Sequence, residues 1–135
     1  MLSYLKQTEK NTCGVIAAMN LDIWRGKKVS IADFPAYKEA LNFKRTTYRR
    51  FFSKWIGSRP TRLNWPKLKQ HLLTGGSAVI LSRRGKTGHF YFVDGVYENW
   101  ARCVNFYPGF PTTWIHWRWL CKLLTRSSVW RIYES

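Results

Sequence analysis

The residues best suited to chemistry begin with a cysteine that directly precedes a glycine, Cys13-Gly14, at the expected start of a helix. Unpaired backbone N–H groups and the positive end of a helix dipole both favour a thiolate over a thiol at such a position. Cys13 is therefore a candidate nucleophile. Free cysteines are also among the most buried residue types, so an inert core thiol is the alternative interpretation.

A second candidate is a single histidine, His89, at the start of an otherwise apolar run that extends from Phe90 to Val93. Its imidazole could act as the base that takes the proton of the thiol. A histidine in this role needs an orienting group on its other ring nitrogen. Two residues that follow it, Asp94 and Asn105, could supply that group.

Strand geometry separates these two orienting candidates. Asp94 lies five residues along the same expected strand, so it faces the opposite side of the sheet, about 16 Å from His89 at 3.3 Å per residue. The midpoint between His89 and Asn105 is residue 97, in an expected turn, so Asn105 should return on the neighbouring strand beside His89. We therefore expect Asn105 to be the orienting residue.

Three helices are expected to position these groups, because apolar residues recur at helical spacing in three stretches. They cover residues 13–24, capped by Asn11 or Thr12 and stopped by Gly26; residues 47–56; and a stretch from Asn64 to the pair Gly75-Gly76. The inward faces are expected to carry Cys13, Ile16, Ala17, Asn20, Ile23 and Trp24 in the first helix, Tyr48, Phe51, Phe52, Trp55 and Ile56 in the second, and Leu68, Leu72 and Leu73 in the third.

Strands dominate the second half, where β-branched and aromatic residues concentrate. We expect strands at residues 77–82, 88–96, about 102–107 and 128–133, with a turn at Glu98-Asn99. Residues 113–124 fit helical spacing and strand alternation equally well. Helices followed by an antiparallel sheet predict an α+β fold, and no linker divides the chain, so we expect a single domain over residues 1–135.

In order and spacing, these motifs resemble the papain-like cysteine peptidases, most closely the small bacterial branch that trims double-glycine leaders from bacteriocins. The resemblance spans about residues 7–108. It rests on a glutamine six residues before Cys13-Gly14 and on three short runs, Gly-Gly-Ser-Ala-Val-Ile-Leu from Gly75, Gly-His-Phe-Tyr-Phe-Val-Asp-Gly from Gly88 and Val-Asn-Phe-Tyr-Pro from Val104.

This resemblance implies a papain-like α+β fold whose nucleophile lies at a helix N-terminus packed on an antiparallel sheet. It also implies that Cys13 attacks, His89 shuttles the proton, Asn105 orients His89, and Gln7 completes an oxyanion hole with the backbone N–H of Cys13. Many members of the bacterial branch carry Asp where Asn105 stands. Papain itself uses Asn, so the residue is compatible with activity.

The implied reaction is hydrolysis of an amide in a protein or peptide substrate, without a cofactor. Two alternatives remain: deamidation or transfer on a protein side chain by the same thiol, and a nucleic-acid-binding module or RNA-cleaving toxin in which Cys13 is structural. We expect no metal site, because His71 and His116 lack partners at ligand spacing and zinc motifs are absent. Cys103 and Cys121 are expected in the core, although an oxidising compartment could join them.

The charge of the chain predicts an anionic partner. Its 135 residues include 23 Lys and Arg against 7 Asp and Glu, for a net charge of +16, and no acidic residue lies between Glu39 and Asp94. Such a field attracts an acidic protein, nucleic acid or an anionic envelope. The outer face of the helix at residues 47–56 is the expected partner-binding surface, through Arg45, Arg49, Arg50 and Lys54.

The N-terminal residues and the length of the apolar runs indicate where in the cell the protein is expected. No window is long and apolar enough for a membrane span, and the first residues are too short and polar for a secretory signal, so we expect a soluble chain that is cytoplasmic or delivered as an effector. No transporter segment follows, so the resemblance does not imply the leader-trimming role. The six residues before Gln7 leave no room for an inhibitory propeptide, so an effector or toxin of this kind is expected to have a separate inhibitor or immunity protein.

Overall fold

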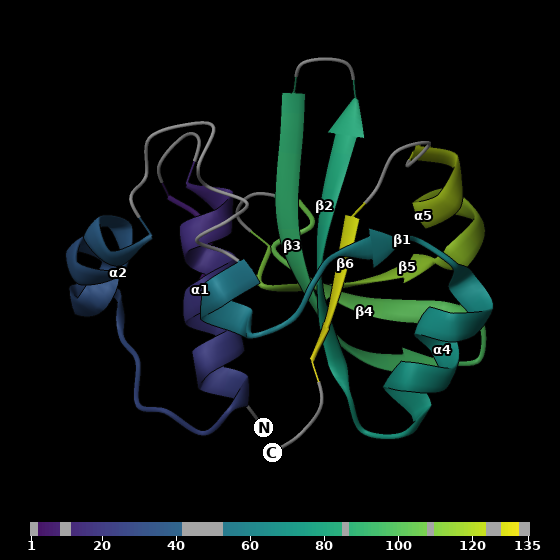
Figure 1. The fold of residues 1–135 in the computed structure, drawn as a ribbon, viewed down its shortest axis with the longest axis horizontal. Coiled ribbons are helices and arrows are strands. Elements are labelled where there is room, and N and C mark those ends of the chain that lie inside the picture. Colours follow the sequence, from purple (N-terminus) through teal and green to yellow (C-terminus); the bar gives the residue numbers. More distant parts are fainter. Residues whose placement is uncertain are drawn as a thin grey trace.

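The computed structural model describes residues 3–8, 12–41, 53–84, 87–107, 110–123 and 128–132 (Figure 1). Its elements are, in chain order, α1 (Cys13–Trp24), the short 3-10 helix η1 (Ile31–Asp33), α2 (Phe34–Ala40), β1 (Thr61–Arg62), α4 (Trp65–Leu73), β2 (Ser77–Arg84), β3 (Thr87–Tyr97), β4 (Trp100–Val104), β5 (Thr112–His116), α5 (Trp117–Leu123) and β6 (Ser128–Ile132).

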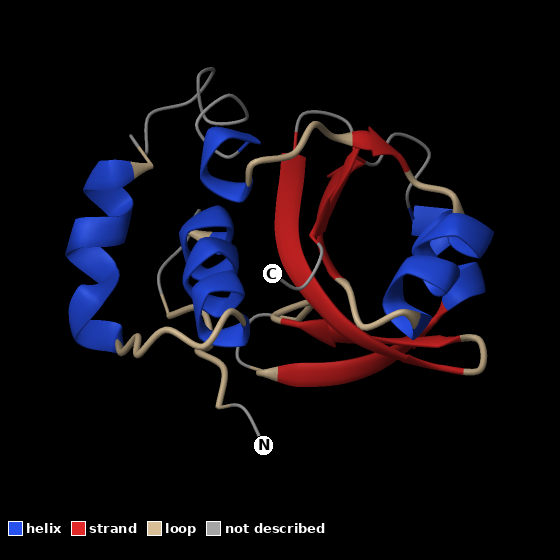
Figure 2. Cartoon of the chain, turned by 60° about the horizontal axis from the view of Figure 1, so that its bottom comes forward, coloured by secondary structure: helices blue, strands red, loops and turns tan. Residues whose placement is uncertain are grey.

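A curved six-stranded sheet separates two groups of helices (Figure 2). Its strand order is β1-β6-β2-β3-β4-β5, and every neighbouring pair is antiparallel. Helices α1 and α2 lie on one side of the sheet, and α4 and α5 lie on the other (Figure 1). The α+β arrangement predicted from the sequence is confirmed.

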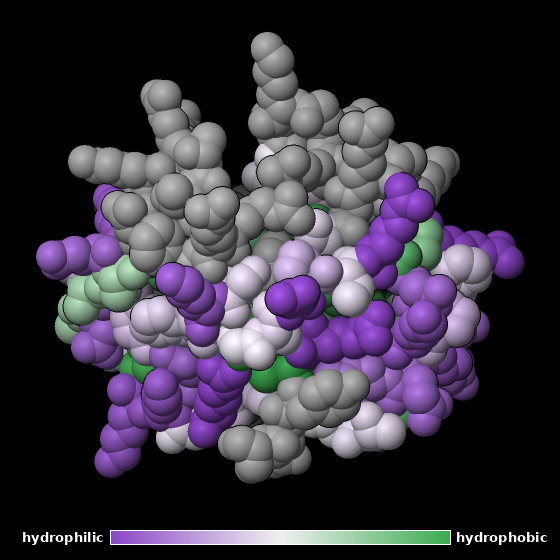
Figure 3. All heavy atoms as spheres, viewed as in Figure 1, coloured by the Kyte–Doolittle hydropathy of each residue, from purple (hydrophilic) through white to green (hydrophobic). Residues whose placement is uncertain are grey.

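Alternation along the strands divides the apolar residues into two cores. On β3, Phe90 and Phe92 face α1, while Tyr91 and Val93 face α4 and α5. Strand side chains point alternately to opposite faces, so β2 and β3 can serve both cores at once. In the view of Figure 3, hydrophilic side chains cover most of the described surface, with only small apolar patches between them.

The helix that carries Cys13 has the predicted bounds, and Gly26 follows it with a left-handed φ of +90°. Thr12 is the N-cap, but its side chain makes no capping hydrogen bond. The expectation of a one-sided inward face is wrong, because every residue from Cys13 to Ile23 is buried. Side chains of α2 cover what would be the outer face, and a helix enclosed in this way is expected to be mostly apolar, as α1 is apart from Asn20 and Asp22.

The other two predicted helices are borne out in part. Asn64 caps α4 by accepting a hydrogen bond from the Lys67 N–H at 3.2 Å, and Leu68 and Leu72 are buried. Leu73, predicted to point inward, is 60% exposed, because it closes the last turn on the solvent side. Of the helix expected at residues 47–56, only residues 53–56 lie within the described part, and these are helical.

The strand predictions differ from the structure mainly at their ends. Glu98 and Asn99 form the predicted turn between β3 and β4, but β4 ends at Val104, so Asn105 follows the strand instead of lying within it. The ambiguous stretch 113–124 contains both alternatives in succession, since β5 ends at His116 and α5 starts at Trp117. Helix α2 and the two-residue β1 were not predicted.

Candidate functional site

Cys13 occupies the first position of α1, where its thiol meets β3. Its side chain is almost fully buried, and Sγ accepts a hydrogen bond from the backbone N–H of Phe90 at 3.3 Å. The pairing of β3 with β4 ends at Phe92 opposite Val104, two residues short of Phe90. The N–H of Phe90 therefore donates to the sulfur at a point where β4 no longer runs beside it.

The electrostatics of Cys13 differ from the expectation based on its helix position. Burial raises the pKa of Cys13, and the N–H groups of Phe90, Gly14 and Cys13 itself lower it by a smaller amount. In the resting site the neutral thiol is thus favoured, because removing the charged sulfur from water outweighs the helix terminus. A nearby base that accepts the proton would favour ionisation of this thiol near neutral pH.

His89 lies on β3 directly before Phe90, and its ring is held from one side. Nε2 is 2.8 Å from the backbone carbonyl oxygen of Asn105, and the ring stacks on Tyr91 with centroids 6.1 Å apart. Burial lowers the pKa of His89, while the backbone carbonyls of Asn105 and Phe106 raise it by a smaller amount. The neutral imidazole is therefore favoured at neutral pH.

The carbonyl contact also assigns the tautomer of His89. A carbonyl oxygen can only accept, so Nε2 carries the proton and donates it to Asn105. In a neutral imidazole the other nitrogen, Nδ1, then holds a lone pair. This nitrogen is the one able to accept a proton.

Asn105 lies beside His89, as the sequence predicts, but the contact is made by its backbone. The residue is 2% exposed and has a left-handed φ of 62°, a conformation that asparagine tolerates better than most residues. Its own N–H donates to the carbonyl of Pro111 at 3.1 Å. The expected side-chain contact to His89 is replaced by this backbone one, because the left-handed turn directs the carbonyl at the ring.

The side chain of Asn105 contacts Gln7 instead. Oδ1 accepts from the Gln7 backbone N–H at 3.2 Å, and Nδ2 donates to the Gln7 side-chain Oε1 at 3.3 Å. Gln7 belongs to residues 3–8, which form neither helix nor strand. Three of the four predicted site residues, Gln7, His89 and Asn105, are thus joined by direct contacts, and Cys13 contacts the residue after His89.

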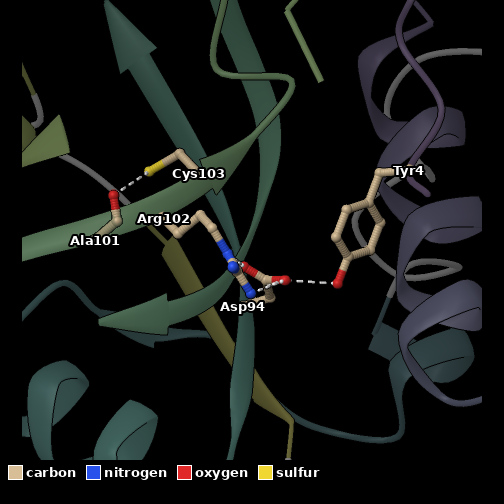
Figure 4. A network of polar contacts seen from close by, with 5 residues as sticks. All are labelled: Tyr4, Asp94, Ala101, Arg102 and Cys103. Carbon is tan, nitrogen blue, oxygen red and sulfur yellow. Dashed lines mark hydrogen bonds and ion pairs between the residues drawn. The ribbon is translucent and has the colours of Figure 1, made fainter. Parts of the chain in front are cut away.

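Asp94 lies away from His89, as predicted. Its carboxylate pairs with Arg102 at 2.7 and 2.9 Å and accepts a hydrogen bond from the Tyr4 hydroxyl at 2.6 Å (Figure 4). The pairing of β3 with β4 shifts between Val93 and Gly95, so Asp94 lies at a bulge. A pocket of about 600 Å³ adjoins this cluster and is lined by Ser3, Tyr4, Asp94, Arg102, Pro111, Thr112 and Trp114.

The remaining candidate residues take structural positions. His71 is buried, with Nε2 2.6 Å from the Ser77 carbonyl oxygen, and His116 Nδ1 accepts from the Arg118 N–H at 3.2 Å. Cys103 is buried and Cys121 half-buried, and both are free thiols. Within the described ranges, no group of three or more His, Cys, Asp or Glu residues could hold a metal ion.

The predicted partner-binding surface is described at only one of its residues. Lys54 is exposed on the helical residues 53–56, whereas Arg45, Arg49 and Arg50 lie outside the described residues. No helix in the part of the chain that the structure covers is long and apolar enough to cross a membrane.

Sequence reasoning missed the groups that the backbone supplies. The Phe90 N–H, the Asn105 carbonyl and the Pro111 carbonyl carry no side-chain signature, so residue types alone could not reveal them. The asparagine at position 105 did carry one signal, because asparagine is enriched in left-handed backbone.

Two solved structures resemble this chain over nearly its whole length. One is the peptidase domain of Streptococcus ComA, a bifunctional ABC transporter involved in quorum sensing; it superimposes with a TM-score of 0.76 at 14% identity and covers 98% of each chain. The other is a double-glycine-motif protease from an AMS/PCAT transporter in complex with the leader peptide, with a TM-score of 0.69, 14% identity, and coverage of 97% of this chain and 91% of that one.

These likenesses establish the fold. The chain adopts the fold of these two peptidase domains, which confirms the papain-like α+β fold that the sequence resemblance implied. No protein-family profile and no curated protein matches the sequence.

Proposed function

We propose that this chain is a cysteine peptidase or related amide hydrolase in which Cys13 is the nucleophile and His89 the base. The contact between His89 Nε2 and the Asn105 carbonyl carries the proposal, because it leaves Nδ1 as the proton acceptor. The Cys13 sulfur accepts a hydrogen bond from the backbone N–H of Phe90, and His89 is the residue directly before Phe90 on the same strand. The thiol and the imidazole are therefore held by the same short stretch of β3. The peptidase fold supports the same assignment.

The reaction begins from the neutral pair that burial favours. Nδ1 of His89 takes the thiol proton as Sγ of Cys13 attacks the carbonyl carbon of the scissile amide. The resulting oxyanion accepts hydrogen bonds from the Cys13 N–H and from the side-chain amide of Gln7. The protonated His89 then gives its proton to the leaving amine, and water hydrolyses the thioester to release the acid and restore the thiol.

The substrate in this proposal is an extended protein or peptide segment. One of the similar proteins is a double-glycine protease solved with its leader peptide, so peptides with a Gly-Gly pair are the first probes to use. Incubation of the purified chain with such peptides and with a mixed peptide library, followed by mass spectrometry, reads out the reaction. Hydrolysis yields two fragments whose masses sum to the substrate plus one water.

Variants at Cys13 distinguish the proposed chemistry from its alternatives. Cys13→Ala should abolish cleavage while its circular dichroism and thermal unfolding match the wild type. A mass gain of about 1 Da on a glutamine, without fragments, would indicate deamidation by the same thiol. Unchanged cleavage in Cys13→Ala would refute the assignment of the nucleophile.

We also infer that the positive charge of the chain recruits an acidic protein, such as an inhibitor or immunity protein that restrains an effector or toxin. The net charge of +16 and the absence of acids between Glu39 and Asp94 support this inference. Replacement of Arg45, Arg49, Arg50 and Lys54 by Gln should slow capture of an acidic protein most strongly at low salt, where the Debye length is long. Displacement of that protein by RNA would favour the nucleic-acid alternative, and a flat salt response in both variants would refute recruitment.

A further inference from the structure

Residues 3–8, here called the strap, form neither helix nor strand and carry Gln7. Three polar side chains with little or no exposure hold it, each from a different element: Asn20 of α1, Asp94 of β3 and Asn105 after β4. Burial of a polar group lowers stability unless the group is hydrogen-bonded, and all three of these side chains form hydrogen bonds with residues of the strap. The position of the strap is therefore strongly specified.

The first two anchors hold the strap upstream of Gln7. The Tyr4 hydroxyl donates to Asp94, which Arg102 fixes in turn (Figure 4). Burial and the neighbouring carboxylate raise the pKa of Tyr4, so the hydroxyl stays protonated and remains a donor. Asn20 accepts from the Leu5 N–H at 2.8 Å and donates to the Leu5 carbonyl at 3.0 Å.

The third anchor determines which end of the Gln7 amide can donate. A backbone N–H only donates, so the atom of Asn105 that faces the Gln7 N–H must be Oδ1. The other atom of that amide, Nδ2, is then a donor, and its partner on the Gln7 side chain must be the acceptor Oε1. The two contacts thereby assign Nε2, the donor that an oxyanion needs, to the opposite end of the Gln7 amide.

We propose that Asn105 is a positioning residue for Gln7, whose side-chain amide it orients, and that Asn105 contacts His89 through its backbone carbonyl and not through its side chain. This inference rests on the proposed function, since it assigns Gln7 to the oxyanion hole. It divides the roles of one residue between two groups. The side chain serves the oxyanion donor, and the left-handed backbone serves the base.

Asn105→Gly separates these roles, because glycine adopts the left-handed backbone freely and keeps the carbonyl while it removes the amide. Cleavage is measured for the wild type, Gln7→Ala, Asn105→Gly and the double variant. Loss of one oxyanion donor typically lowers kcat by about 10²–10³. We expect each single variant to fall toward this range and the double variant to match Gln7→Ala, since the amide acts only through Gln7. Losses that multiply in the double variant would overturn the proposal.

The rate of Cys13 alkylation by iodoacetamide is a second measurement, and it does not depend on an oxyanion hole because this reaction forms no oxyanion. Asn105→Gly should alkylate at the wild-type rate, whereas an Asn105 side chain that oriented His89 would slow the reaction when removed. Tyr4→Phe is the matched control, because it removes one hydrogen bond of the strap three residues from Gln7. It should lower the melting temperature and leave kcat within about twofold. A loss of kcat equal to that of Asn105→Gly would assign the effect to general loosening of the strap and overturn the specific role.

A structural measurement keeps this inference distinct from the proposed function. In ¹⁵N spectra the side-chain amide of Gln7, assigned by its absence in Gln7→Ala, should change its shift and exchange faster in Asn105→Gly. Failure of the wild type to cleave any peptide would refute the proposed function, and the amide spectrum would still decide the positioning. An unchanged Gln7 resonance in Asn105→Gly would overturn it. If Asn105→Gly does not fold, Asn105→Asp, which lacks the Nδ2 donor, is compared in the same spectra.

Discussion

The pH dependence of thiol labelling tests whether His89 ionises Cys13. Burial raises the pKa of all three cysteines above the ordinary value of 9.0, and Cys121 is the most exposed of them. An unassisted thiol with a pKa of 9 is about 0.3% thiolate at pH 6.5 and about 24% at pH 8.5, so its labelling rate rises about 75-fold, and a higher pKa brings the rise nearer to a hundredfold. Accessibility alone therefore ranks Cys121 first among the three thiols.

Transfer of the proton to Nδ1 of His89 changes this ranking for Cys13. The pair exchanges a proton internally and binds none from solvent, so we expect the wild-type rate at Cys13 to be nearly constant from pH 6.5 to 8.5. At pH 6.5 Cys13 should be labelled at least about tenfold faster than Cys121, and Cys103, which is fully buried, slowest of all. The assay is brief exposure to iodoacetamide, digestion and quantification of the three alkylated peptides by mass spectrometry.

The variant His89→Ala supplies the decisive comparison. Without the imidazole, Cys13 should show the steep rise of an unassisted thiol and fall below Cys121 at pH 6.5, while Cys121 keeps its wild-type rate as an internal control. A wild-type Cys13 that rises nearly a hundredfold over this interval, or one that is unaffected by His89→Ala, would refute the reasoning and leave Cys13 as an inert core thiol.

Three further predictions follow from particular contacts. Burial lowers the pKa of His89 below its usual 6.5, and Nδ1 must be unprotonated to act, so the acid limb of kcat/KM should have its midpoint below pH 6.5; a midpoint above 6.5 would contradict the assignment of His89 as a base that is neutral in the resting site. Asp94→Asn weakens the pairing with Arg102 and should lower the free energy of unfolding by about 1–3 kcal/mol in urea titrations, with kcat within about threefold of the wild type, whereas abolished turnover would place Asp94 in the site. Gly76→Ala would put a methyl group 2.4 Å from the buried His71 ring and should cost about 1–3 kcal/mol, while Gly95→Ala, whose nearest neighbour lies at 3.6 Å, is the control and should cost less.

The elements with strong local signals were predictable from the sequence. The helix at Cys13–Trp24 has its predicted bounds because a left-handed glycine, Gly26, ends it. Residues 113–124 showed both strand alternation and helical spacing, and the structure contains both a strand, β5, and a helix, α5. The boundary at His116–Trp117 could not be found from the sequence, because the two patterns overlap there. Tertiary packing determined what remained, such as the enclosure of α1 between α2 and the strands of the sheet.

The site was predictable to the level of residue identity and no further. Strand spacing predicted that Asn105 lies beside His89, and the family resemblance added Gln7, but the partner of each polar atom depends on backbone geometry. Because β4 ends at Val104, Asn105 lies just after the strand and directs its carbonyl, not its side chain, at His89. Strand spacing estimated from residue numbers does not resolve where β4 ends, because the bulge at Asp94 shifts the register.

The chemistry of position 105 explains why an asparagine suits this arrangement better than the aspartate found in many members of the bacterial branch that the sequence resembles. A carboxylate can accept from the Gln7 N–H as Oδ1 does, but it has no donor for Oε1. It would attract Nε2 of the same amide and turn this donor, which we propose serves the oxyanion, toward itself. A chain in which this side chain holds the glutamine must therefore orient its histidine by another group, and here the carbonyl exposed by the left-handed backbone of Asn105 does so.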